Sequence, residues 1–437
     1  MNNKYFTVII IILGLILLGI FTAWFLVNRG YIQLNSTNNP SNTIDSAATN
    51  SLFPTGGGEN SNSTNSGSGF VSSNSNSATS SVILSGNQLD KQLTKLDTSP
   101  IGALLAVGKA TSTILFFERA TGHLFQIPPS GSPFRLTNTT MPKVVAAGGG
   151  MVGSTTNFII RTNNYQWETK FASLTNSIAS SSSLFLGTED EVGSMPQTLT
   201  VKPSPVAAFD FAISPLENQI AYLEHTPENT NLIVTNWDNS KWEKVASLPV
   251  TQTNLTWSGI DTITIQTKAS YTADGLLYFY NLKTKKLDKI ISGVKGLSTK
   301  VSPDARYVLY SGSNNGTLFA ALYDRRTGKI DRLPFKTLAE KCVWSRGSDL
   351  IYCGAPANAP SGDYPDVWYQ GSTSLKDNLW ELEVATKKAT LLFNPELNNL
   401  SETIDATQLT LDEVNQQLYF INKNDFSLWR LTLGTGF

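Results

Sequence analysis

A serine that precedes a short turn and an apolar run recurs in this chain. The copies begin at Ser214, Ser258, Ser302 and Ser345, with separations of 44, 44 and 43 residues. A fixed period in this range indicates a repeat architecture, in which each repeat is one supersecondary unit that buries its apolar faces against its neighbours.

Each repeat can be divided into four short strands. The last hairpin recurs as YNLKTKKLDKI, YDRRTGKIDRL and LEVATKKATLL, starting at Tyr280, Tyr323 and Leu382, with a looser copy around Asn239. Lys, Gly or Asn stands at the turn, where a positive φ is tolerated or the side chain faces water. Four antiparallel strands in roughly 40–50 residues predict an all-β fold, the β-propeller. We count seven four-stranded blades, which begin near Ile101, Lys143, Ala208, Thr253, Gly296, Glu340 and Asp405.

Two stretches carry a family resemblance. SPDARYVLY, which begins at Ser302, resembles the Ser-Pro-Asp-Gly blade pattern of TolB-like, WD40-like (PD40-type) propellers, with Ala305 where that family usually has Gly. The segment from Ile114 to Thr137 shares their strand–turn layout. The resemblance covers about 350 residues at the level of architecture, and it implies a fold without transferring any catalytic residue. An array of immunoglobulin-like sandwiches is the alternative, but a sandwich does not repeat every four strands.

The last repeat contains only three strands before the printed sequence stops. The segment DKQLTKLDT (Asp90 to Thr98) resembles the outer strand of blade one. Since an unpaired outer edge would be exposed, we expect this segment to pair with the strand at 428–433 and to close the ring.

Residues 5–27 form an uncharged apolar run that is long enough to cross a bilayer as a helix. The run exceeds the apolar core of a signal peptide, so we expect an uncleaved anchor. Lys4 before the run and Arg29 after it slightly favour residues 1–4 in the cytoplasm. The expected protein is single-pass, with a periplasmic or extracellular propeller.

Residues 28–85 are rich in Ser, Asn, Thr and Gly, and from Asn35 to Ser80 the only charged residues are Asp45 and Glu59. Such a composition buries too little apolar surface to fold, so we expect a disordered linker. The propeller domain is expected over residues 86–437.

Composition argues against several functions. The net charge of −1 gives no basic surface for nucleic acid. The two histidines, His123 and His225, have no metal-type spacing, and no metal or other cofactor is predicted.

The run from Gly148 to Gly153 matches a dinucleotide-binding pattern, but a strand-like segment follows it. We expect those glycines to form the first turn of blade two.

Two repeats contain insertions, Thr175 to Gln197 and Ala355 to Asp377. Loops on a rigid scaffold often carry binding sites, and exposed Trp and Tyr are frequent anchors. The candidate binding residues of the second insertion are Asp363, Tyr364, Asp366, Trp368 and Tyr369. We expect the three rings to lie on one rim; the alternative is that Trp368 folds back onto its own blade.

These features predict a membrane-tethered, extracytoplasmic binding or scaffolding module, with no assigned catalytic residue. Its partner would be an envelope or cell-surface protein or a glycan. The alternative is a glycosidase or lyase that uses acids at the central funnel, and Asp363 and Asp366 are candidate acids.

The only two cysteines lie in one repeat, KCVWSRGSDLIYC. If RGSD is a four-residue turn, the register places Cys342 directly opposite Cys353, close enough for a disulfide. An extracytoplasmic domain can be oxidised, so we predict this disulfide; the alternative is two free buried thiols.

Overall fold

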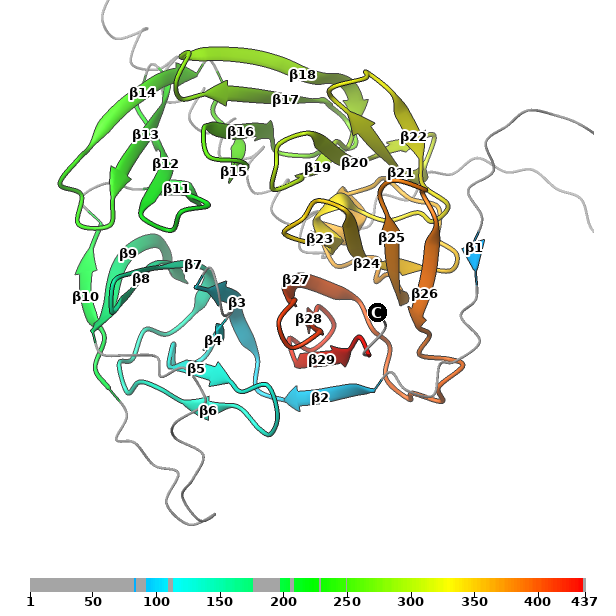
Figure 1. The fold of residues 1–437 in the computed structure, drawn as a ribbon, viewed down its shortest axis with the longest axis horizontal. Helices are drawn as coiled ribbons and strands as arrows, with labels where there is room; N and C mark the ends of the chain where they lie inside the picture. Colours follow the sequence, from blue (N-terminus) through cyan, green and yellow to red (C-terminus); the bar gives the residue numbers. More distant parts are fainter. Residues whose placement is uncertain are drawn as a thin grey trace, which may run out of the picture. The chain divides into compact units, whose positions relative to one another are not determined.

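Each repeat of the sequence forms one antiparallel sheet in the computed structural model of the protein, and seven sheets surround one axis (Figure 1). The predicted seven-bladed all-β propeller is confirmed. The structure describes residues 82–83, 92–108, 113–175, 197–204, 208–227, 229–248 and 250–434. The expected anchor at 5–27, nearly all of the linker and most of the first insertion lie outside them. Among the described residues, no helix is long and apolar enough to span a membrane.

In every blade the first strand lies innermost and the others follow outward (Figure 1). Blade one contains β3 (Ile101–Val107), β4 (Thr113–Glu118), β5 (Leu124–Ile127) and β6 (Phe134–Arg135). Blade two contains β7 (Val144–Val152), β8 (Thr155–Asn164), β9 (Gln166–Thr175) and β10 (Thr200–Pro203). Blade three contains β11 (Ala208–Ile213), β12 (Gln219–His225), β13 (Thr230–Asn236) and β14 (Glu243–Leu248). Blade four contains β15 (Thr253–Trp257), β16 (Thr262–Thr267), β17 (Asp274–Asn281) and β18 (Lys286–Lys295).

The remaining blades follow the same plan. Blade five contains β19 (Ser298–Val301), β20 (Tyr307–Asn314), β21 (Thr317–Asp324) and β22 (Ile330–Arg332). Blade six follows the 3₁₀ turn η2 (Ala339–Lys341) and contains β23 (Cys342–Trp344), β24 (Leu350–Pro356), β25 (Asp377–Glu383) and β26 (Ala389–Phe393). Its outer edge also pairs in parallel with β1 (Val82–Ile83). Blade seven contains β27 (Ala406–Asp412), β28 (Gln417–Asn422), β29 (Leu428–Thr432) and β2 (Leu93–Asp97). Every blade begins within two residues of its expected position.

The fourth strand of blade seven comes from the other end of the propeller sequence. Strand β2 pairs antiparallel with β29, with Leu93 opposite Leu431 and Thr94 opposite Arg430 (Figure 1). Lys95 adds ion pairs at 3.2 Å to Glu402 and 3.1 Å to Asp425 of the same blade. The ring is therefore closed by main-chain hydrogen bonds that join the start of the domain to its last blade.

Among the described residues, seven of the eight hydrophobic clusters lie between blades, and each combines side chains from two adjacent blades. Between blades seven and one, for example, Tyr419 and Ile421 pack with Ile101, Ile114 and Phe116. Burial of apolar area is the main favourable term in folding. Each blade therefore depends on both of its neighbours.

The glycine run of blade two lies in the innermost strand β7, and not in a turn as expected; only Gly153 lies in the turn, with φ of 61°. A Cβ on Gly149 would lie 2.8 Å from Leu105 of blade one. A Cβ on Gly148 would lie 2.8 Å from Phe211 of blade three. The glycines therefore let both neighbouring blades approach this strand.

The recurring serine caps the inner turn of its blade. The hydroxyl of Ser302 accepts the Tyr307 backbone N–H at 2.8 Å, and that of Ser345 accepts the Leu350 N–H at 2.9 Å. Both serines are buried, and a buried N–H requires a partner. Ser214 accepts the Gln219 N–H in the same way at 3.1 Å, so three of the four recurring serines pair an equivalent main-chain donor, which explains the serine at those positions.

The outer hairpins also have the expected turn geometry. The backbone has a positive φ at Asn239 (59°), Lys285 (56°), Gly328 (73°) and Lys387 (62°). This confirms the interpretation of those positions as turns that require a left-handed residue.

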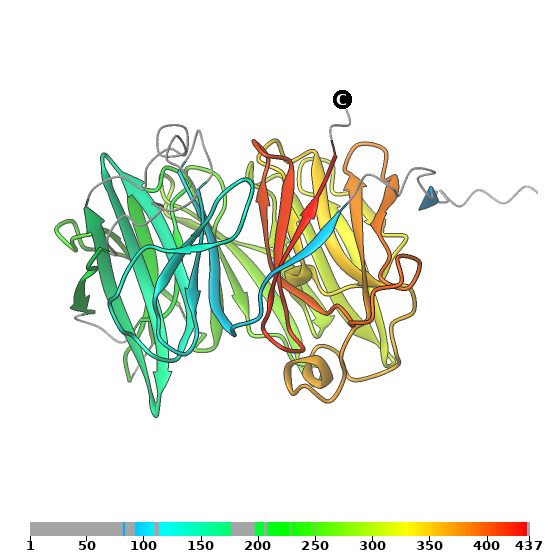
Figure 2. The same ribbon diagram turned by 90° about the horizontal axis from the view of Figure 1, so that it is seen from below.

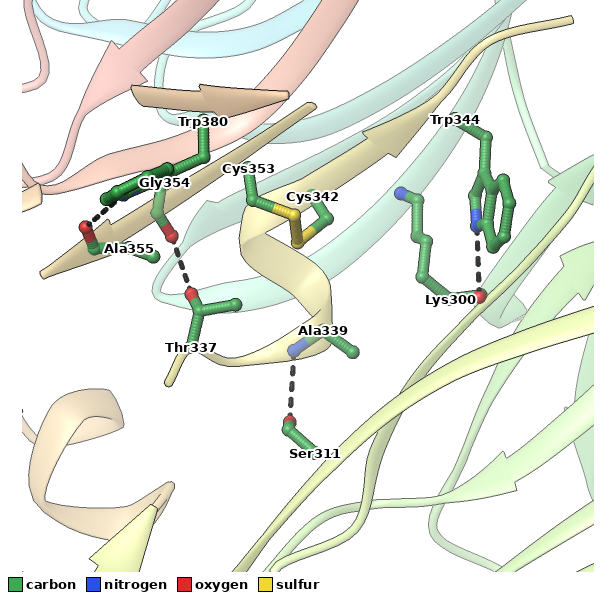
Figure 3. The surroundings of a disulfide bond; sticks show 10 residues. All are labelled: Lys300, Ser311, Thr337, Ala339, Cys342, Trp344, Cys353, Gly354, Ala355 and Trp380. Carbon is green, nitrogen blue, oxygen red and sulfur yellow. Dashed lines mark hydrogen bonds between the residues drawn. A yellow bond between two sulfur atoms is a disulfide. The ribbon is translucent and has the colours of Figure 1, made fainter. Parts of the chain in front are cut away.

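Cys342 and Cys353 form a disulfide across the first two strands of blade six (Figure 3). The two residues are direct register partners. The turn closes through the Ser345 backbone N–H, which donates to the carbonyl of Leu350 at 2.9 Å. The predicted register is confirmed, and the disulfide is buried among the side chains between blades five and six.

Deletion of residues 92–97 from the full chain is expected to destabilise the propeller. The deletion removes β2, together with the half-buried Leu93 and Leu96, which contribute about 2–3 kcal/mol together. We expect a melting temperature lower by about 4 °C or more in a thermal scan. Deletion of residues 86–91 is the control of equal length. Equal melting temperatures for the two deletions would contradict the closure by β2.

Loss of the disulfide is expected to lower the free energy of unfolding by about 2–3 kcal/mol, because the bond closes a short loop in the unfolded chain. Cys342→Ser/Cys353→Ser should show this loss in urea denaturation, and reductant should reproduce it in the wild type. Mass spectrometry after alkylation under denaturing, non-reducing conditions checks the bond directly. Complete alkylation of both thiols in the purified full chain would contradict it.

Candidate functional site

The propeller has two distinct faces. The turns between the first and second strands of the blades emerge on one side, which we call the inner-turn face. The loops between the second and third strands emerge on the other side, which we call the insertion face, because it holds the loop 357–376 of blade six. Figure 2 shows the helical turn of that loop and the long β8–β9 hairpin projecting from this same side.

The insertion folds around a small core of its own. Tyr364 is fully buried and Trp368 is only 3% exposed. They pack with Leu318, Leu338 and Leu375. The expectation of three exposed rings is therefore wrong for Tyr364 and Trp368, because a loop of this length needs apolar contacts to hold it on the blades. Trp368 folds back, as in the alternative, but it packs against Leu318 of blade five and not onto its own blade.

Trp368 is held by the buried carboxylate of Asp405. The Trp368 indole N–H donates to both carboxylate oxygens of Asp405 at 3.0 Å. The Ser374 hydroxyl and the Leu375 backbone N–H each donate to Oδ2 at 3.1 Å. A residue of blade seven thus fixes the insertion of blade six by charge-assisted hydrogen bonds.

Lys341 lies between two buried acids. Its ammonium donates to Asp405 Oδ1 and lies 2.8 Å from Asp377 Oδ2, and all three side chains are fully buried. Asp377 Oδ2 also accepts the Ala406 N–H at 2.7 Å, while Asp377 Oδ1 has no hydrogen-bond partner. Burial raises the pKa of Asp377 to about 7. Since Asp405 accepts the larger set of donors, we assign the main ion pair of Lys341 to Asp405 and the weaker one to Asp377.

The other predicted residues of the insertion separate into two groups. Asp366 accepts the Tyr271 backbone N–H and the Ser270 hydroxyl, at 3.3 Å for the latter, and so fastens the loop to blade four. Asp363 is exposed. Tyr369 is 45% exposed, and its hydroxyl donates to Glu340 at 2.6 Å. Burial raises the pKa of Glu340. Only Asp363 and Tyr369 of the five predicted binding residues therefore present substantial surface.

Exposed aromatic rings gather on the insertion face. In the described part of the chain, four of the five exposed aromatic side chains lie there: Tyr165 (93% exposed), Trp167 (58%), Tyr369 (45%) and Phe426 (38%). The fifth, Trp242, lies in a turn on the inner-turn face. Tyr165 and Trp167 were not predicted from the sequence, although the available signal was NYQW at the junction of two strands of ten residues each.

Three of these rings have a cation beside them. Lys143 Nζ lies 4.6 Å from the Tyr165 ring centroid, and the Arg161 guanidinium lies 4.8 Å from that of Trp167. Arg119 of blade one lies 4.6 Å from the Phe426 ring of blade seven. Aromatic rings with adjacent cations suit a partner surface with apolar and acidic groups.

Within the described ranges, no group of three His, Cys, Asp or Glu side chains has a metal-binding arrangement. His123 and His225 lie in different blades. Lys341, Asp377 and Asp405 were not singled out from the sequence, because nothing local relates residues of three separate segments.

No family model matches the chain, and no curated protein matches it. Solved structures share its fold. TolB from Acinetobacter baumannii is 10% identical, with 65% of this chain and 79% of that chain covered and a TM-score of 0.38. Oligogalacturonate lyase in complex with manganese is 9% identical, with 75% and 86% covered and a TM-score of 0.48.

The tricorn protease is 9% identical with a TM-score of 0.46; the match covers 78% of this chain but only 34% of the tricorn chain. These likenesses concern the fold alone. TolB structures are among the similar folds, so the fold-level resemblance to TolB-like propellers is confirmed.

The charge assignment in the buried cluster predicts that substitution of its two acids lowers the free energy of unfolding by different amounts. Asp405→Asn leaves Lys341 without its main charged partner, and is expected to cost about 3–5 kcal/mol in urea denaturation. Asp377→Asn is expected to cost far less, because Asp377 accepts fewer donors and burial already raises the pKa of its carboxyl to about 7.

The pH dependence of stability provides the second measurement. The pKa of Asp377 is raised on folding, so the unfolded chain releases this proton from about pH 4 upward while the folded chain retains it to about pH 7. Its contribution to stability therefore falls as the pH rises through this window. Asp377→Asn should remove that fall, relative to the wild type at pH 5 and pH 8. A larger cost for Asp377→Asn than for Asp405→Asn would reverse the assignment.

Proposed function

We propose that the chain is a membrane-tethered, extracytoplasmic propeller that binds a protein or polymer of the cell envelope. The observation that carries this proposal is the concentration of exposed aromatic rings on the insertion face. Exposed tyrosine and tryptophan bury large rigid areas on binding and are enriched among residues that dominate interface energies.

Three further features support the placement and the manner of binding. The uncharged run at 5–27 would anchor the chain. The disulfide of blade six suits an oxidising compartment outside the cytoplasm. The loop 357–376 is tied to blades four and seven through Asp366 and Asp405, so Tyr369 stands on a fixed support, and little conformational freedom is lost on binding.

A double substitution on the β8–β9 hairpin tests the proposal. Full-length protein in solubilised membranes is cross-linked, and the partner recovered with the wild type is identified and its affinity measured. Tyr165→Ser/Trp167→Ser should weaken that affinity by about thirtyfold, because it removes two interface anchors. Higher ionic strength should weaken binding to the wild type, because Lys143 and Arg161 flank the rings.

Ile260→Ser is the matched control, because Ile260 is 63% exposed but lies in the inner turn of blade four on the other face. It should leave the affinity unchanged. Unchanged affinity in the hairpin variant, or a loss in the Ile260 variant alone, would argue against the insertion face as the binding surface.

A further inference from the structure

We infer that the cleft between blades two and three is a binding site for a sugar that carries carboxylate groups. The cleft has a volume of about 750 Å³, within the usual range for small-molecule sites. One wall comes from β9 and β10, and the other from residues 236–241, the turn after β13. The cleft lies toward the inner-turn face, so this inference does not rest on the proposed function of the insertion face.

The aromatic floor of the cleft is fixed before any ligand binds. Trp237 and Phe171 line the cleft and belong to the hydrophobic cluster between blades two and three. The Trp237 indole N–H donates to the carbonyl of Glu217 at 2.7 Å. A Cβ on Gly150 would lie 2.9 Å from the Trp237 ring, so this glycine makes room for the indole. A rigid indole is a suitable platform for the apolar face of a sugar ring.

The polar rim offers donors to a ligand. Asn218 Oδ1 accepts the Ser214 hydroxyl, and Asn239 Oδ1 accepts the Thr235 hydroxyl, each at 3.1 Å. In the part of the chain that the structure describes, Nδ2 of both asparagines donates to no protein acceptor. The two asparagines therefore use their acceptors within the protein and present their N–H groups. A ligand rich in hydrogen-bond acceptors matches this rim.

The charges of the rim favour an acid over a neutral sugar. Lys202 and Lys241 are exposed on opposite walls of the cleft. Asp238 is the acid of the lining, and it already accepts the Ser240 backbone N–H at 3.0 Å. Hydrogen bonds from Ser240 hold the pKa of Asp238 below its usual value. One negative charge thus faces two positive charges, so the rim favours an anionic ligand such as a carboxylate.

Isothermal titration calorimetry on the full chain in detergent tests this inference with two probes. One probe is a tetrasaccharide of a uronic acid, and the other is the neutral tetrasaccharide of the corresponding hexose. The acidic probe should bind more tightly. Lys202→Ala/Lys241→Ala should weaken that binding by about tenfold, because two exposed ion pairs are lost. Asn218→Asp should weaken it too, since it replaces a donor by a charged acceptor.

Lys283→Ala/Lys286→Ala is the matched control, because both lysines lie near the outer turn of blade four. It should bind the acidic probe as the wild type does. Equal affinity for the two probes, unchanged affinity in the Lys202/Lys241 variant, or no binding of the acidic probe would each overturn the inference. Tyr165→Ser/Trp167→Ser should leave sugar binding unchanged. The sugar site in the cleft and the proposed partner surface on the insertion face are therefore tested independently.

Discussion

The structure depends on ring closure, because no blade has a core that belongs to it alone. Each of the seven hydrophobic clusters lies between two neighbours. An open ring would expose the apolar faces of its first and last blades, and the unpaired edge of the last blade would be open to other strands. The pairing of β2 with β29 prevents this, since it makes the first and last segments of the domain parts of one sheet.

The same coupling between blades creates the polar features of the two faces. Asp405 of blade seven binds Trp368 of blade six through its carboxylate, so the insertion is held by a neighbour and not only by its own blade. A buried charge is tolerated because several donors and Lys341 satisfy it. On the other face, Trp237 of blade three lies over Gly150 of blade two. Both candidate surfaces are therefore shaped at blade boundaries and rest on fixed supports.

Much of the fold could be predicted because its signals are local and repeated. The recurring serines located blades three to six, and three of these serines pair an equivalent N–H of the inner turn. The turn length alone set Cys342 opposite Cys353, because strand pairing fixes the register on both sides of a short turn. The likeness of DKQLTKLDT to an outer strand indicated the pairing of β2, which the incomplete last repeat required.

The candidate functional sites could be predicted from the sequence less completely than the fold. The sequence identified the insertion as a surface feature, but it could not show that Tyr364 and Trp368 are buried while Tyr369 is not, since burial depends on which neighbours cover each ring. Lys341 and Asp405 are 64 residues apart in the chain, and no local pattern relates them. The sequence by itself determined the repeat, the turns and the strand register, because these follow from short-range geometry. Only the tertiary structure decided which rings are exposed and which charges meet, because those properties arise where separate blades come into contact.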